Sequence, residues 1–146
     1  MKLSTKGKYG LNAMYYLALH AGDGPQPLKA VAEIGVSSED YLEQLLGSLR
    51  RAGLVTTVRG AQGGYQLAHA PEAITVGDII DATEGPLNIS ECISDEACCH
   101  RSGQCRTRMV WEYLSNRINH VLQSITLQDM LEPERFEQLA QEMSKE

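Results

Sequence analysis

The chain has 146 residues, of which 42% are hydrophobic and 22% charged, and a net charge of −6 at pH 7; that length suits one compact core with an extension. Polar residues interrupt the apolar ones near the N-terminus, unlike a signal peptide, and no apolar run approaches the roughly 18 residues of a membrane span. We therefore expect a soluble cytoplasmic protein with no membrane partner, in which free thiols outlast disulfides.

Two helices are predicted before residue 36. The first spans Leu3 to Ala21, where apolar residues recur at helical spacings, and the turn-forming "GDGPQP" ends it. A short second helix fits Leu28 to Ile34, and Gly35 breaks it.

The clearest helix lies in "SSEDYLEQLLGSLRRAGL". Ser37 followed by Asp40 approximates a capping box, and Gly53 suits the left-handed position after the last turn. One face carries an apolar stripe: Tyr41, Leu42, Leu45, Leu46 and Leu49. The opposite face is polar or small and is available to read a partner: Ser38, Glu39, Glu43, Gln44, Gly47 and Ser48.

A β-hairpin follows this helix directly. The segments 54–58 and 65–67 are rich in β-branched and aromatic residues, and the glycine-rich "RGAQGG" between them forms the tip. Because a helix–turn–helix followed by a hairpin is the order of a winged helix, we expect that architecture. A nucleotide-binding loop fits poorly, since the glycines lead into a strand and no Gly-Lys-Ser/Thr enters a helix.

Further helices follow the hairpin. Thr75 caps the short helix "VGDIIDAT", and Gly85-Pro86 opens a cysteine-rich stretch. A long helix spans about Arg106 to Ser124, and a final segment begins at Thr126 with a break near Pro133. The long helix carries a heptad-like apolar seam, with spacings of 3, 4, 3 and 4: Trp111, Leu114, Ile118, Val121 and Ile125. Few elements remain to cover so wide a stripe, so we expect it to pack against a second copy; an intramolecular core is the alternative.

The charge is divided unevenly along the chain. Residues 1–68 carry seven Lys and Arg against five Asp and Glu, whereas residues 69–146 carry six against fourteen. The first half is therefore mildly basic and can face phosphate, while the acidic second half is turned away. Random surface variation is the alternative explanation.

Four blocks of the sequence resemble the signature blocks of the Rrf2 family of bacterial regulators, and most closely its iron–sulfur regulators: "MKLSTKGKYGLNAM", "YLEQLLGSLRRAGLV", "RGAQGGYQLA" and "ITVGDIIDATEGPL". The resemblance covers residues 1–131. It implies a dimeric winged-helix transcription factor, mainly a repressor and not an enzyme, that dimerises through the long helix. The expected fold is mainly α with a small β-hairpin, a winged helix–turn–helix plus a long dimerisation helix.

The resemblance also implies three parts. Residues 1–84 would form the DNA-binding domain, 85–105 a cysteine-rich cluster-binding loop, and 106–146 the dimerisation helix with a C-terminal helical segment. Carried over by position, the DNA-reading residues would be Ser38, Tyr41, Glu43 and Gln44 on the third helix, with Arg59, Gly60 and Gln62 at the wing tip. These types suit a double-stranded, roughly palindromic operator, because Gln pairs with adenine, Glu accepts from cytosine and Arg fits a narrow minor groove. The alternative for each is a solvated surface residue.

All four cysteines lie in "ECISDEACCHRSGQCRTRMVW": Cys92, Cys98, Cys99 and Cys105. A disulfide fits poorly, because the chain is expected in the cytoplasm and adjacent cysteines strain the bond geometry. Structural zinc favours Cys-x2-Cys pairs, which are absent from the sequence. A thiol switch needs no fixed spacing and stays open.

The spacing Cys92-x6-Cys99-x5-Cys105 followed by xTRxxW resembles the three-cysteine loop of cluster-binding family members. The resemblance implies an iron–sulfur cluster, 2Fe-2S rather than 4Fe-4S, with these three thiolates as ligands, and thiolate softness favours the same cofactor. The fourth ligand departs from the family. Arg108 stands where iron–sulfur regulators have histidine, and Lys8 stands where nitric-oxide sensors have aspartate. The remaining candidates are Cys98, His100 and Glu91.

The expected function is a regulator of iron–sulfur assembly genes, and three alternatives to it are open. The same loop suits a sensor of nitric oxide or of redox state. A thiol oxidoreductase is less compatible, because the sequence shows no flavin or nicotinamide fingerprint and no Cys-x2-Cys. A metal-independent interaction module is a third class, but the resemblance associates that role with cysteine-metabolism regulators that lack a cysteine loop.

Overall fold

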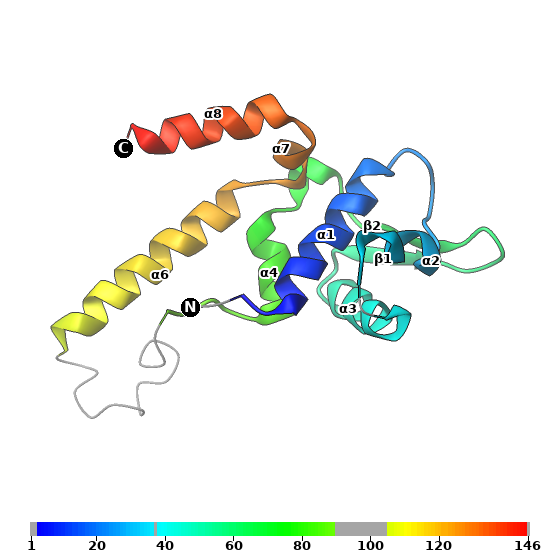
Figure 1. Ribbon diagram of the computed structural model, residues 1–146, viewed down its shortest axis with the longest axis horizontal. Helices are drawn as coiled ribbons and strands as arrows, with labels where there is room; N and C mark the ends of the chain where they lie inside the picture. Colours follow the sequence, from blue (N-terminus) through cyan, green and yellow to red (C-terminus); the bar gives the residue numbers. More distant parts are fainter. Residues whose placement is uncertain (1–2, 37, 90–104, 146) are drawn as a thin grey trace.

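The computed structural model describes residues 3–36, 38–89 and 105–145 (Figure 1). It is predominantly helical with one antiparallel hairpin, which confirms the expected fold class. Its α-helices and strands are α1 (Thr5–Leu19), α2 (Leu28–Val31), α3 (Glu39–Arg51), β1 (Val55–Val58), β2 (Gly64–Leu67), α4 (Val76–Glu84), α6 (Arg106–Ser124), α7 (Leu127–Leu131) and α8 (Pro133–Ser144). The short 3-10 helices η1 (Ala32–Ile34) and η2 (Pro71–Ala73) complete the described elements.

One apolar core lies among α1, α3, α4 and the hairpin. Met14 and Leu17 from α1 are essentially inaccessible to solvent, as are Leu46 from α3 and Ile79 from α4. Leu127, from the distant α7, is also fully buried in this core. The C-terminal part of the chain therefore contributes to the core of the N-terminal part. The expected division at residues 84 and 105 stays a prediction.

The ends of α3 are fixed by local hydrogen bonds. Ser38 is the N-cap, and its hydroxyl accepts from the Tyr41 amide at 3.1 Å. The expected capping box of Ser37 and Asp40 is thus wrong by one position, because Ser38 adopts the extended backbone that a cap requires. At the other end Gly53 has a φ of 80°, and the Leu54 amide donates to the Leu49 carbonyl at 3.0 Å. This is the Schellman closure that the Gly53-Leu54 pair predicts.

The hairpin forms the wing that the sequence predicts. Val55 pairs with Leu67 and Val58 with Gly64 in an antiparallel register. A bridge between Gln26 and Tyr65 attaches β2 to the segment before α2, with amide-to-carbonyl distances of 2.8 Å in both directions. The wing is therefore held against the helix–turn–helix unit.

The C-terminal end of the long helix α6 is attached to the core. The Val76 amide donates to the Ile125 carbonyl at 2.8 Å, and the Leu127 amide donates to the Ile74 carbonyl at 3.0 Å. Thr75 and Thr126 each begin a helix with a reciprocal capping box, and the two residues form an isolated antiparallel bridge. This junction fixes the base of α6, and the rest of the helix runs away from the compact body (Figure 1).

Most of α6 is accessible to solvent. Among its residues only Ser115 is buried, whereas Met109, Val110, Tyr113 and other apolar residues of the N-terminal half are exposed. The predicted bounds of this helix, 106–124, agree with those observed. None of the helices in the described residues combines the length and the apolarity needed to cross a membrane.

Candidate nucleic-acid interface and cysteine segment

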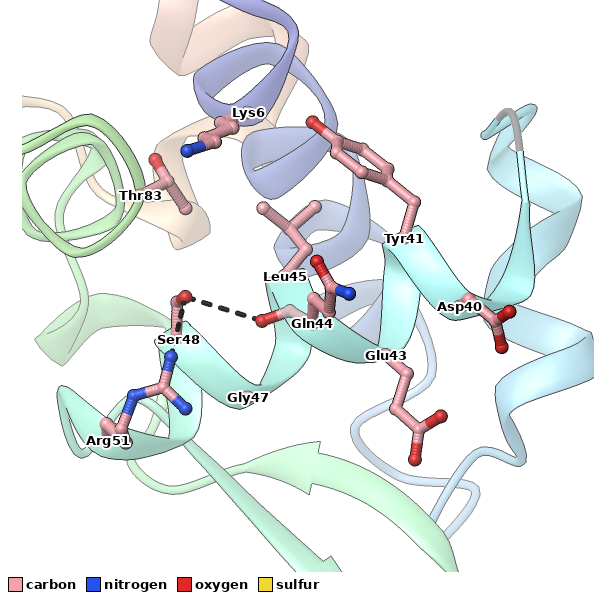
Figure 2. A pocket seen from close by; sticks show the side chains of 10 residues that line it. All are labelled: Lys6, Asp40, Tyr41, Glu43, Gln44, Leu45, Gly47, Ser48, Arg51 and Thr83. Atoms are coloured by element: carbon pink, nitrogen blue, oxygen red, sulfur yellow. Dashed lines mark hydrogen bonds between the residues drawn. The ribbon is translucent and has the colours of Figure 1, made fainter.

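A groove of about 570 Å³ lies between the exposed face of α3, the first turn of α1 and the end of α4 (Figure 2). We refer to it as the α3 groove. Its lining residues are Lys6, Asp40, Tyr41, Glu43, Gln44, Leu45, Gly47, Ser48, Arg51 and Thr83. The groove thus brings together residues from three helices around the face of α3 that the sequence predicts to read DNA.

Cations stand on two sides of the α3 groove. Lys6 extends from the first turn of α1, and Arg51 lies in the last turn of α3. The Arg51 guanidinium donates to the Ser48 hydroxyl at 3.1 Å, and that hydroxyl donates to the Gln44 carbonyl at 3.3 Å. The Ser48 hydroxyl therefore holds the guanidinium beside the helix. Two cations flanking a polar helix face suit contacts to the phosphates on either side of a DNA groove.

The two predicted residues nearest the start of α3 already have partners. The Ser38 hydroxyl serves as the N-cap of the helix. The Tyr41 hydroxyl shares a hydrogen bond of 3.2 Å with the Thr5 hydroxyl of α1, and its ring forms a T-shaped pair with the ring of Tyr9. Both side chains consequently help to hold α3 in place.

Glu43 and Gln44 are exposed on α3 and point to different sides of the helix (Figure 2). Burial raises the pKa of Tyr65 in β2, and the negative charge of Glu43 raises it further, while Arg50 opposes the shift. Glu43 is therefore close enough to the wing to act on it electrostatically. An exposed carboxylate and an exposed carboxamide on neighbouring residues of one helix can distinguish donors from acceptors on base edges.

The predicted wing-tip residues are all exposed. Arg59, Gly60 and Gln62 lie in the turn between β1 and β2, and Gly60 has a φ of 113°, a conformation that favours glycine. The tip can therefore approach another molecule without a steric barrier from its own chain.

Sequence reasoning missed the contribution of α1 and α4 to this surface. The predicted residues did not include Thr5, Lys6, Arg51 or Thr83. The one available signal was the positive charge of the N-terminal half. It could not place Lys6 beside α3, because that proximity depends on the packing of α1 against two other helices.

Both described ends of the cysteine stretch are attached to α6. On one side the Ile89 amide donates to the buried Ser115 hydroxyl at 3.1 Å, and the Asn119 amide group donates to the Leu87 carbonyl at 3.4 Å. On the other side Cys105 is the N-cap residue of α6. The segment between them, including Cys92, Cys98 and Cys99 and the candidate ligands Glu91 and His100, lies outside the described residues.

Cys105 is the one predicted cluster ligand among the described residues. It is half-buried at the N-terminus of a 19-residue helix, where the helix dipole favours a negative charge. Its sulfur lies 2.9 Å from the Thr107 hydroxyl. A thiol in this position fits a soft metal or an iron–sulfur cluster. Within residues 3–36, 38–89 and 105–145, no three His, Cys, Asp or Glu side chains gather as a metal site. The predicted set of ligands therefore stays a prediction.

The two positions that depart from the family pattern are on different helices. Arg108 is half-buried in the first turn of α6, and Lys8 is exposed on α1. Neither side chain is a ligand for a cluster, since both are cationic donors.

Residues 3–133 match the Rrf2 family, described as iron-dependent transcriptional regulators. The chain belongs to the Rrf2 family. The match covers most of the sequence, including α1, the wing and α6, and it confirms the resemblance of the four sequence blocks. As a family member the protein is a DNA-binding transcriptional regulator of the winged-helix type, and its relatives are named regulators and not enzymes.

Rrf2 relatives of two kinds are similar to this chain. The regulator CymR of Bacillus subtilis is 46% identical over 130 residues, which cover 89% of each chain. A solved structure of IscR from T. potens is 50% identical, covers 91% of this chain and 88% of its own, and has a TM-score of 0.74. The solved structure of B. subtilis CymR, titled the global cysteine regulator, is 45% identical, covers 89% of this chain and 95% of its own, and has a TM-score of 0.73.

The Rrf2 fold is thus shared almost equally with an IscR and a CymR. Overall similarity does not choose between these two kinds of regulator. The choice has to come from the chemistry of the residues that this chain carries.

Proposed function

We propose that this protein is a dimeric, cytoplasmic repressor that senses an iron–sulfur cluster and controls iron–sulfur assembly genes. The observation that supports this proposal best is a set of contacts that runs from the end of α4, which precedes the cysteine-rich stretch in the chain, to the face of α3. Glu84, the last residue of α4, bonds Ser4 and Gly7 at the start of α1, and Thr5 of α1 bonds Tyr41 of α3. A change in the segment after α4 can therefore reach the helix that reads DNA.

The proposed DNA contacts combine reading and positioning. Ser38, Tyr41, Glu43 and Gln44 of α3 would face the major groove, and Arg59, Gly60 and Gln62 of the wing would face the adjacent minor groove. Lys6 and Arg51 on either side of the α3 groove would bind phosphates, which positions the helix without adding sequence information.

The proposed cluster would be 2Fe-2S rather than 4Fe-4S, held by the thiolates of Cys92, Cys99 and Cys105. When bound, it would supply a redox-active group whose presence depends on iron and sulfide. The described residues near the proposed cluster would set the positions of its ligands. Cys105 is fixed by the start of α6, and the bonds from Ser115 and Asn119 fix residues 87–89 on the same helix.

The dimer would form through the seam of α6 and would bind a roughly palindromic operator with half-sites about one helical turn apart. The exposed apolar half of α6 supports this arrangement, because such a surface is costly to leave in water. Ile118→Glu would place a charge in the middle of the seam, and we expect monomers that fail to bind the operator.

Anaerobic purification tests the cluster directly. We expect a coloured protein whose visible spectrum and iron and sulfide contents correspond to a 2Fe-2S cluster. Binding to operator DNA should then differ between the coloured protein and the same protein after the cluster is removed. A colourless protein that contains neither iron nor sulfide after anaerobic reconstitution would contradict the proposal.

A thiol or redox sensor is the second candidate, because the CymR relatives are as similar as the IscR relatives. The position of Cys105 at a helix N-terminus also suits a reactive thiolate. In that case a mild oxidant should change DNA binding in protein that holds no iron, and Cys105→Ser should abolish the response. The absence of an oxidant effect on the iron-free protein would favour the cluster.

A further inference from the structure

The wing is joined to the segment before α2 by a reciprocal pair of backbone hydrogen bonds. The Gln26 amide donates to the Tyr65 carbonyl, and the Tyr65 amide donates to the Gln26 carbonyl, each at 2.8 Å. We refer to this residue pair as the wing clip. It adds one residue of a third antiparallel strand to the two-stranded hairpin, since Tyr65 lies in β2.

The segment that carries the clip is stiff. Pro25 and Pro27 flank Gln26, and a proline ring fixes its own φ and restricts the residue before it. The Gln26 side chain is also held, because its carbonyl oxygen accepts from the Tyr16 hydroxyl at 3.4 Å and its amide group donates to the Gly24 carbonyl at 3.2 Å. The wing is thus clipped to a segment that is itself fixed to α1.

The two adjacent glycines of the wing serve different contacts. A Cβ on Gly63 would overlap the Val58 carbonyl oxygen within the hairpin, so Gly63 permits the tight turn. A Cβ on Gly64 would overlap the Gln26 carbonyl oxygen outside the hairpin. Gly64 therefore permits the close approach of β2 to the clip segment, and any side chain at this position would push the two apart.

The clip lies directly beside the wing tip. Gly64 pairs with Val58, the last residue of β1, and Arg59 follows Val58 in the chain. The other end of β1 is attached to α3 by the bond from the Leu54 amide to the Leu49 carbonyl. A two-stranded hairpin is only marginally stable alone, so one anchor at its base would leave the tip free to pivot. The clip supplies a second anchor at the tip end.

We infer that Gly64 and the wing clip are positioning elements for DNA binding, which hold Arg59 at a fixed place relative to α3. The inference rests on the proposed minor-groove contact of Arg59 and explains how that contact is prepared before DNA arrives. A tip that is already in place lets α3 and the wing enter adjacent grooves together. A loose tip would lose affinity, because it would have to be ordered on the DNA.

The test measures how the effect of Arg59→Ala depends on the clip. Arg59→Ala is introduced into wild type and into three variants of the full chain: Gly64→Ala, Gln26→Pro and Gly22→Ala. Gln26→Pro removes the amide that donates to Tyr65 without adding an atom at position 64. Gly22→Ala is the matched control, since a Cβ there has no neighbour within 4 Å.

Fluorescence anisotropy gives the affinity of each protein for one DNA site selected by wild type, at fixed salt and in one cluster-loading state. Thermal unfolding shows that each variant is folded. If Gly64→Ala does not unfold cooperatively, Gln26→Pro alone decides the result.

We expect Arg59→Ala to weaken binding about fivefold or more in wild type and in Gly22→Ala, but less than about twofold in Gly64→Ala and Gln26→Pro. The two clip variants should already bind less tightly, because their wing contact is lost. An equal loss from Arg59→Ala in all four backgrounds would show that the clip does not position the tip, while the wing contact stands. No loss in wild type would overturn both the proposed contact and the inference.

Discussion

The Glu84 carboxylate accepts a hydrogen bond of 2.9 Å from the backbone amide of Gly7, 77 residues earlier in the chain. The Ser4 hydroxyl donates to the same carboxylate oxygen. A carboxylate from α4 thus accepts hydrogen bonds from donors at the start of α1, where the helix dipole favours negative charge. Gly7 permits this approach, because a Cβ at that position would lie 2.9 Å from the carboxylate oxygen.

Replacing Glu84 by alanine should lower the free energy of unfolding by about 1 to 2 kcal/mol at pH 7, since charge-assisted hydrogen bonds are lost. The bond from Ser4 lowers the pKa of Glu84, and the Gly7 amide and the charge of Lys6 lower it further, against the opposing effect of burial. A lowered folded-state pKa stabilises the protein above the ordinary glutamate pKa and loses that effect as the pH falls through the lowered value.

Urea unfolding at fixed protein concentration measures this effect. The difference between wild type and Glu84→Ala should be complete above about pH 4.5 and should shrink at more acid pH. Glu84→Gln should recover part of the stability without the pH dependence, because its carbonyl still accepts. Glu72→Ala, an exposed change outside this contact, is the control. A difference between wild type and Glu84→Ala that does not vary with pH would disprove the assignment.

The cluster ligands can be tested by colour. Alanine at Cys92, Cys99 or Cys105 should each bleach the anaerobically purified protein, because a cluster that loses one thiolate is held by too few ligands. Cys98→Ala should leave most of the colour and is the matched control, since it removes the neighbouring thiol. The visible absorption spectrum and the iron content report the result. If Cys98→Ala bleaches and Cys99→Ala does not, the middle ligand is misassigned.

Local sequence signals predicted the elements better than the contacts among them. Apolar periodicity placed α6 at its observed bounds, and Thr75 and Thr126 were found as helix starts because capping depends on residues a few positions apart. The α3 cap was misplaced by one residue because adjacent serines carry the same signal. The contact between Glu84 and Gly7 could not be predicted, since only tertiary packing brings together residues so distant in the chain.

Arg59→Ala should weaken binding to most operators by on the order of 1–3 kcal/mol, because a wing-tip guanidinium fits a narrow, negative minor groove. A salt titration of operator binding measures the change in affinity and in its salt dependence. Arg135→Ala removes the same charge from α8, where Arg135 pairs with Asp129 at 3.5 Å, and should bind as wild type. Equal affinity and equal salt slope for both variants would make Arg59 a solvated surface residue.

Glu43 lies on the helix that is proposed to enter the DNA groove. A carboxylate near phosphate lowers the affinity for DNA, so Glu43 is expected to contribute something other than affinity. Glu43 is exposed and points away from the two cations that flank the α3 groove. It can accept from the amino group of cytosine, but opposite a base edge that carries only acceptors it is desolvated and repelled. The carboxylate therefore penalises wrong sites more than it rewards the right one.

We accordingly expect Glu43→Ala to bind a wider range of sequences, with higher affinity for poor sites and little loss on the best one. Selection of binding sites from a random DNA pool measures this, with wild type and Glu43→Ala each tested with and without cluster. Glu39→Ala, an exposed change in the first turn of the same helix, controls for the loss of charge. If the contacts from Glu84 through α1 to Tyr41 transmit the state of the cysteine segment, wild-type preferences should also differ between the two cluster states. Identical preferences in all four pools would show that Glu43 does not discriminate and that the cluster does not act through α3.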